Sequence, residues 1–282
     1  IELIVVDNGS SDRTVEIARA WGAKVLELPG VTLGCLRNQG VRYARGAILA
    51  FIDADCIADS DWLEQGASSL AKEPCITGSF HDIPEEATWL EKAWFVYRER
   101  GRCETSHINT SNLFVTKELF EQLGGFDESL VTGEDSEFSA RAKRIVKVIS
   151  DERIRVVHLG NPKTLGEFMR REIWHGLGAL GSFRVSCLDK PLLGTLGFLV
   201  CSIGQIVGIV ALILGLGVSL LALSTAVLLS LLILTVWYRR RFILSPSHAL
   251  KLGFIYYIYY FSRAISLCFL LCRRTRFRPR SS

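Results

Sequence analysis

The segment AILAFIDADCIADSDW, residues 47–62, places an apolar run directly before four closely spaced aspartates. The run AILAFI has the length and composition of a buried strand. Upstream of it, residues 1–46 alternate strand-like and helix-like stretches, and this alternation predicts an α/β fold built from parallel βαβ units. Ligands bind to such sheets at the carboxyl ends of the strands. We therefore expect Asp53 and Asp55, which follow the run at once, to belong to a ligand site.

Three interpretations of these aspartates compete. A calcium-binding loop would span residues 53–64, but Ile57 and Ala58 stand where such a loop needs an oxygen ligand and a glycine. An aspartyl phosphatase would use the first aspartate as a nucleophile. That interpretation leaves the apolar segments near the C-terminus unexplained. A divalent-cation site fits best, because a cation shared by Asp53 and Asp55 cancels their repulsion and leaves positions for phosphate oxygens. The later aspartates of the segment, 59 and 61, are expected to be turn and helix-capping residues.

The charge of the chain is concentrated beside its apolar segments. The net charge of +4 at pH 7 comes largely from arginines next to these segments, so we expect a membrane surface as partner and no nucleic acid. The eight cysteines form no Cys-x-x-Cys pattern, which favours reduced thiols in a cytoplasmic domain.

A transmembrane helical hairpin is predicted for residues 191–238. This stretch contains no charged residue and is long enough for two membrane helices of about 20 residues each. Gly215 and Gly217 lie near its middle and are expected to form the turn. Residues 177–190 are expected to be a juxtamembrane amphipathic segment that leads into the hairpin.

A third apolar segment, residues 248–272, differs from the hairpin. Lys251 and Arg263 interrupt it, and its tyrosines cluster as they do in helices at the headgroup level. With a cytoplasmic domain before it, the hairpin returns the arginines 239–241 to the cytoplasm, as the positive-inside rule requires. We favour a helix lying on the membrane for this segment, followed by a basic tail at 273–282, and keep a third span as the alternative.

Four motifs in the first part of the chain occur in a fixed order: IVVDNGSSDRT, RNQGVRYARGAILAFIDAD, NLFVTKELFEQLGGFDE and GEDSEFSARA. Asp-x-Asp alone is a weak signal, but the ordered set resembles the family 2 glycosyltransferases. The resemblance covers nearly all of residues 1–176 and implies a Rossmann-like GT-A fold that binds a nucleotide-sugar donor. It also implies an inverting transfer that depends on a divalent cation, Mn2+ or Mg2+. A membrane hairpin after the domain is similar to members that act on lipid or envelope acceptors.

The resemblance also implies roles for individual residues. Asp135 matches the catalytic base, with Glu134 beside it. Asp55 matches the metal ligand, and His158 matches a histidine that completes the metal or phosphate shell in some relatives. The matches to the nucleotide-sugar site are Asp7, Arg37, Asn38, Asp53, Arg171 and Trp174. Asp12, in the same loop as Asp7, is expected to cap the following helix.

Several of these residues also have simpler interpretations. Glu134 and Asp135 would be favoured at any helix N-terminus by the macrodipole. A lone histidine such as His158 is more often structural than a ligand, and Arg171 would suit a membrane surface.

The paired acids favour a hydroxyl acceptor. Adjacent carboxylates raise one another's pKa, which improves a base that must take a proton from the acceptor. Together with the resemblance and the membrane hairpin, this leads us to expect transfer to a lipid-linked or envelope glycan at the cell membrane, with the catalytic domain in the cytoplasm. A polyprenyl phosphate acceptor, which needs no base, is the first alternative, and a non-catalytic relative is the second.

One family feature has no match in this sequence. Members usually open with a strand that ends in a Pro-x-Tyr-Asn-like turn. A sheet without that strand would have an exposed edge and a half-open base pocket, and if the polypeptide starts at Ile1 we expect weak nucleotide binding and low stability.

Overall fold

The computed structural model describes residues 1–95, 101–182, 190–240 and 243–272. The chain forms two compact units. The first unit comprises residues 1–84 and 97–160, and the second comprises residues 85–96 and 161–274. The sequence analysis predicted a first domain over residues 1–176. In the structure, the first compact unit ends at residue 160, and residues 161–176 belong to the second unit. The expected segment 177–190 lies partly, and the basic tail 273–282 wholly, outside the described residues.

The first unit contains three β-sheets among its described residues. Strands β1 (Ile4–Asp7) and β2 (Lys24–Glu27) form a parallel pair, and β4 (Cys56–Ala58) and β9 (Val156–His158) form an antiparallel pair. A five-stranded sheet has the order β3-β7-β5-β8-β6: β3 is Ile48–Ile52, β5 is Cys75–Gly78, β6 is Arg102–Glu104, β7 is Asn112–Thr116 and β8 is Lys147–Asp151.

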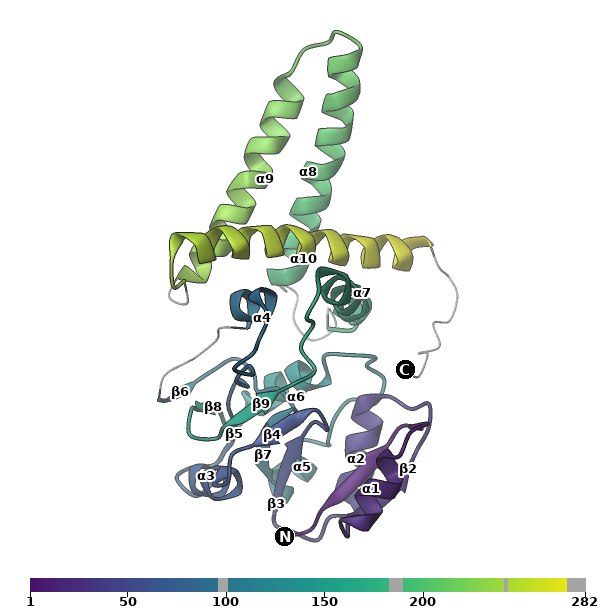
Figure 1. The fold of residues 1–282 in the computed structure, drawn as a ribbon, viewed down its shortest axis with the longest axis vertical. Helices are drawn as coiled ribbons and strands as arrows, with labels where there is room; N and C mark the ends of the chain where they lie inside the picture. Colours follow the sequence, from purple (N-terminus) through teal and green to yellow (C-terminus); the bar gives the residue numbers. More distant parts are fainter. Residues whose placement is uncertain (96–100, 183–189, 241–242, 273–282) are drawn as a thin grey trace. The chain divides into compact units, whose positions relative to one another are not determined.

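The expectation of parallel βαβ units is confirmed for the first two strands and wrong for the third. Helices α1 (Thr14–Ala20) and α2 (Leu33–Tyr43) lie beside the parallel β1–β2 ladder (Figure 1). Strand β3 instead pairs antiparallel with β7 along its whole length. No ladder joins β1 to β3 in the part of the chain that the structure describes, and Ile48 and Ile52 of β3 are 41% and 38% exposed. Strand β3 is thus an edge strand of the five-stranded sheet.

Helices cover both faces of the five-stranded sheet. Successive side chains of a strand point to opposite faces, and the residues of β7 follow this rule. Leu113 and Val115 pack into a core with residues of α2, α5 (Lys117–Gln122) and α6 (Glu134–Ala142). Phe114 points the other way, onto Trp62 of α3 (Trp62–Leu70), at a ring distance of 4.7 Å. The sheet is thus a rigid support for the loops at its edge.

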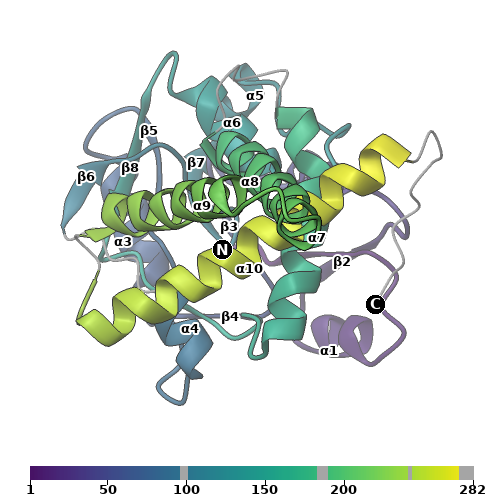
Figure 2. The same cartoon turned by 90° about the horizontal axis from the view of Figure 1, so that it is seen from above.

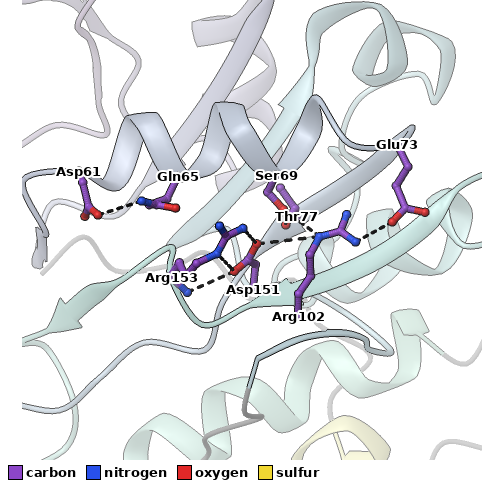
Figure 3. A network of polar contacts seen from close by, with 8 residues as sticks. All are labelled: Asp61, Gln65, Ser69, Glu73, Thr77, Arg102, Asp151 and Arg153. Carbon is purple, nitrogen blue, oxygen red and sulfur yellow. Dashed lines mark hydrogen bonds and ion pairs between the residues drawn. The ribbon is translucent and has the colours of Figure 1, made fainter.

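A buried carboxylate joins β8 to its neighbours (Figure 3). Asp151 is 1% exposed and accepts hydrogen bonds from Arg153 at 2.9 and 2.6 Å. Arg102 of β6 lies 3.9 Å from the same carboxylate and donates to Glu73 at 2.6 Å. Burial alone would raise the pKa of Asp151, but the hydrogen bonds from Arg153 hold it below its usual range.

The second unit is helical. It comprises α4 (Trp89–Trp94), α7 (Leu165–Ser182), α8 (Lys190–Ile213), α9 (Ser219–Tyr238) and α10 (Pro246–Cys272). Three segments are long and apolar enough to cross a membrane: Pro191–Ile213, Ser219–Tyr238 and Pro246–Phe269. Gly215 and Gly217 turn between α8 and α9 with φ values of 74° and 101°, as expected. In Figure 1, α8 and α9 stand side by side and α10 runs across their base, and Figure 2 shows the same crossing from above.

Candidate active site

The β4–β9 ladder brings Asp55 and His158 together. Cys56 lies opposite His158 in the register, and the backbone of Leu159 donates to the Asp55 carbonyl oxygen at 2.8 Å. His158 Nε2 lies 3.5 Å from Asp55 Oδ1. The imidazole is buried, while the Asp55 side chain is 47% exposed. A pair of this kind could hold a divalent cation such as Mn2+, with the Asp55 carboxylate and the His158 imidazole as protein ligands and water or phosphate oxygens as the others.

Gly160 leaves room for this pair. A Cβ atom at this position would lie 1.8 Å from Asp55 Oδ2 and 3.3 Å from His158 Cε1. Only a residue without a side chain therefore lets the Asp55 carboxylate keep its place. The sequence analysis did not identify Gly160.

Cys56 is the third potential ligand in this cluster. The ligand atoms of Asp55, Cys56 and His158 all lie within 4.8 Å of one another. Burial raises the pKa of the Cys56 thiol to about 12, with a further contribution from the carboxylates of Asp53 and Asp55. A protonated thiol is a poor ligand for a hard cation, so Asp55 and His158 remain the donors.

Arg37 joins the two acidic segments of the site. Its guanidinium donates to Asp53 Oδ1 at 3.1 Å and to Glu134 Oε1 at 2.5 Å. The Arg37 side chain is 16% exposed and that of Glu134 is 6% exposed. The bridge connects α2, the end of β3 and the start of α6. Arg37 and Asp53 were both predicted to contact the nucleotide sugar, and the structure brings these two together.

Glu134 and Asp135 open helix α6 but lie in different environments. Gly133 precedes them with φ of 86°, a left-handed conformation that favours glycine. Burial raises the pKa of Glu134, and the nearby Asp135 raises it further, although Arg37 opposes the shift. Asp135 is half-buried, and its Oδ1 accepts a hydrogen bond from the backbone of Ser136 at 2.7 Å. Asp135 is thus the acid of the pair that an incoming group reaches more easily.

Two further predicted residues hold the backbone in place. Asp7 is 5% exposed and accepts hydrogen bonds from the backbone of Gly9 and Ser10 at 2.8 and 2.9 Å. Its pKa is lowered, mainly by the Ser10 hydroxyl. Asn38 donates to the Phe126 carbonyl oxygen at 2.8 Å and accepts from its N–H at 2.9 Å. Their contacts with a nucleotide therefore stay predictions.

The remaining aspartates were assigned with mixed success. Asp12 accepts from the backbone N–H of Thr14 at 3.0 Å, so its expected capping role is confirmed. Asp61 stands at the N-cap position of α3, as expected, but its side chain makes no cap hydrogen bond and accepts instead from the Gln65 side chain at 3.1 Å. Asp59 forms an ion pair with Arg155 at 3.7 Å. Residues 56–58 form strand β4, which excludes a calcium-binding loop over this segment.

Arg171 and Trp174 belong to the second unit. Arg171 on α7 lies over the Phe95 ring at 5.6 Å and donates to His175 at 3.4 Å. The Trp174 ring lies 4.9 Å from that of His175. Their predicted role toward the donor diphosphate stays a prediction.

The sequence analysis missed His81. Its ring lies 4.6 Å from the ring of His158, at an interplanar angle of 32°. The signal was present, because His81 follows strand β5 in the run GSFHD, at a strand's carboxyl end.

The sequence of the first unit matches a known family. Residues 1–124 match the description Glycosyl transferase family 2. This part of the chain is similar to that family. The matched stretch includes Asp53 and Asp55 and ends before Glu134.

Two archaeal relatives carry glycosyltransferase names. Glycosyltransferase AglE of Haloferax volcanii is 33% identical over 153 residues, which are 50% of each chain. The glucosyl-dolichyl phosphate glucuronosyltransferase of the same organism is 24% identical over 152 residues, 45% of this chain and 46% of that protein. The chain thus spans about half the length of these relatives.

A solved structure confirms the fold. The mannosyltransferase PcManGT from Pyrobaculum calidifontis, in complex with GDP-Man and Mn2+, matches with a TM-score of 0.58 and 18% identity. The match covers 94% of this chain and 76% of that chain. The expected fold, a GT-A-type α/β domain followed by apolar helices, is confirmed.

Proposed function

We propose that the chain is a membrane-anchored glycosyltransferase that moves a sugar, with inversion, from a nucleotide-diphosphate donor to a lipid-linked or envelope acceptor. The observation that carries the proposal is the Asp55–His158 pair, buried on the imidazole side and open on the carboxylate side. A divalent cation held there would supply positive charge against the diphosphate that leaves.

The other residues of the site have separate roles in this proposal. Arg37 holds Asp53 beside the cation site and also neutralises Glu134. Asp135 takes the proton of the acceptor hydroxyl, because it is the more exposed acid of the pair. Glu134 keeps the start of α6 in place through Arg37, so its predicted catalytic part becomes one of positioning.

Two observations support a lipid-linked acceptor and the membrane location. The described part of the chain has three helices long and apolar enough to cross a membrane. The name of one Haloferax relative describes a glucosyl-dolichyl phosphate as its acceptor. The positive-inside rule favours a cytoplasmic position for the glycosyltransferase domain.

The test is a transfer assay on the full-length chain in membranes, with Asp55→Asn, Asp135→Asn and the control Asp61→Asn. UDP-sugars and GDP-sugars are offered in turn, with a lipid-linked sugar as acceptor. We expect Asp135→Asn to lower turnover by about 10²- to 10⁴-fold. We also expect Asp55→Asn to abolish the Mn2+-dependent turnover and Asp61→Asn to change nothing.

The outcomes separate the rival functions. Normal turnover in both Asp55→Asn and Asp135→Asn would contradict the proposal. Loss of turnover in Asp55→Asn alone would favour an acceptor that is already a phosphate anion.

A further inference from the structure

Helix α10 meets the α8–α9 hairpin at the hairpin's base. Arg239, at the end of α9, donates to the Tyr256 hydroxyl at 3.2 Å. One turn earlier on α9, Thr235 lies 3.0 Å from the Tyr260 hydroxyl. The Tyr260 ring also fills the space beside Gly194, near the start of α8, where a Cβ would lie 2.6 Å from it. Both Tyr256 and Tyr260 lie near the middle of α10, so its midpoint is level with the open end of the hairpin.

Both ends of α10 are joined to helices that carry charged residues. Near its start, His248 Nε2 lies 3.0 Å from the Ala93 carbonyl oxygen of α4. Near its other end, Arg263 forms a buried ion pair with Glu172 of α7 at 3.0 Å, and Ser266 donates to an α7 carbonyl at 2.7 Å. Within the described residues, neither α4 nor α7 is apolar enough to cross a membrane.

The side of α10 that faces away from these contacts is apolar and aromatic. Five of its exposed residues recur at intervals of three, four and seven, so they lie along one stripe of the helix, which the exposed Lys251 and Phe269 flank. This stripe consists of Leu250, Phe254, Tyr257, Phe261 and Cys268. The opposite side is buried against the other helices of the second unit.

We propose that α10 lies in the plane of the membrane surface, with this stripe in the boundary between lipid headgroups and acyl chains, and does not span the bilayer. The crossing in Figure 1 fits this arrangement, with the hairpin standing on the middle of a flat helix. The consequence is that both ends of α10, and the helices α4 and α7, lie on the same side of the membrane.

The spanning alternative requires unfavourable burial. If α10 crossed the bilayer, its middle would lie at the membrane midplane and would hold the base of the hairpin there. One or both of α4 and α7, with the Glu172–Arg263 ion pair, would then enter the hydrocarbon, where each ionised side chain costs at least about 2.5 kcal/mol. An interfacial helix avoids this cost because its charged side remains in contact with water and headgroups. The inference does not depend on the proposed transfer activity.

Spin-label depth measurements test it on the full chain. A variant without native cysteines receives one nitroxide at 250, 257, 261 or 268 and is reconstituted in phosphatidylcholine–phosphatidylglycerol vesicles. Positions 250 and 268 are about 27 Å apart along a helix. We expect all four labels at nearly one depth near the headgroups. Labels at 200, 207 and 213 on α8 are the control, because their depth must change along the helix.

A depth profile with 257 and 261 near the midplane and 250 and 268 about 10 Å or more shallower would overturn the proposal. A second measurement keeps the native cysteines: a tag after Ser282 is tested for protease access in sealed vesicles, together with the first unit. We expect tag and first unit on the same side. Tag and first unit on opposite sides would mean a third span and would refute the surface position.

Discussion

Replacing Gly160 by alanine tests how the site holds its cation ligand. The new Cβ would lie 1.8 Å from Asp55 Oδ2, whereas real Cβ atoms essentially never come within 3.0 Å of another heavy atom. The carboxylate must therefore retreat by at least about 1.2 Å, and His158, at 3.3 Å from the new atom, is crowded as well. Losing the support of a metal ligand typically weakens metal binding by about 10- to 100-fold, which is about 1.4–2.8 kcal/mol.

The fold should tolerate this change. Gly160 is exposed and its backbone is not left-handed, so alanine fits its conformation. We expect the free energy of unfolding to change by no more than about 0.5 kcal/mol. The matched control is Gly46→Ala, whose Cβ would meet only the Ile48 carbonyl oxygen at an ordinary 3.5 Å.

The assay is a titration of the full-length protein with Mn2+, followed by the electron paramagnetic resonance signal of the free ion, with and without GDP or UDP. We expect Gly46→Ala to match the wild type and Gly160→Ala to bind Mn2+ about 10- to 100-fold more weakly. Equal Mn2+ affinity in Gly160→Ala and the wild type would refute the reasoning, because the displaced carboxylate would then not be a ligand.

Three further predictions concern stability, measured by chemical denaturation of the full chain. Arg37→Met leaves the buried Glu134 carboxylate unpaired and should cost about 3–5 kcal/mol, whereas Glu134→Gln should cost less than about 1 kcal/mol; equal losses would contradict the bridge. The pKa of Asp151 is lowered in the folded protein, so its carboxylate stabilises the fold at pH values above the ordinary aspartate pKa, about 4. The free energy of unfolding should therefore fall as the pH drops below that value, and Asp151→Asn should reduce this pH dependence. An unchanged pH dependence in the variant would contradict this role of Asp151. Gly66→Ala places a Cβ 2.2 Å from the Phe114 ring and should cost about 1–3 kcal/mol; no loss would mean that the helix shifts freely.

The local features of the fold could be predicted from the sequence. The strand before Asp53, the hairpin turn at Gly215 and Gly217, and the cap at Asp12 depend on neighbouring residues, and the structure agrees with each. The pairing of β3 with β7 could not be predicted in this way. An apolar run signals a buried strand but carries no information about which distant strand lies beside it.

The candidate site shows the same division. Asp55 is visible in the sequence because it follows a strand, whereas its proximity to His158 comes from the β4–β9 register and was expected only from the family resemblance. The Arg37 bridge was missed because it joins two helices and a strand end that lie far apart in the chain. Asp61 occupies the expected N-cap position of α3, but the expected cap hydrogen bond is absent, because the capping rule considers only the backbone and Gln65 offers a competing partner.

The most direct test of the account is a crystal structure of the full-length protein with Mn2+ and either GDP or UDP, recorded with anomalous scattering from manganese. The account predicts a manganese peak within bonding distance of the Asp55 carboxylate and His158 Nε2, with diphosphate oxygens completing the shell. A manganese–nucleotide complex bound elsewhere, with Asp55 and His158 free of metal, would contradict it.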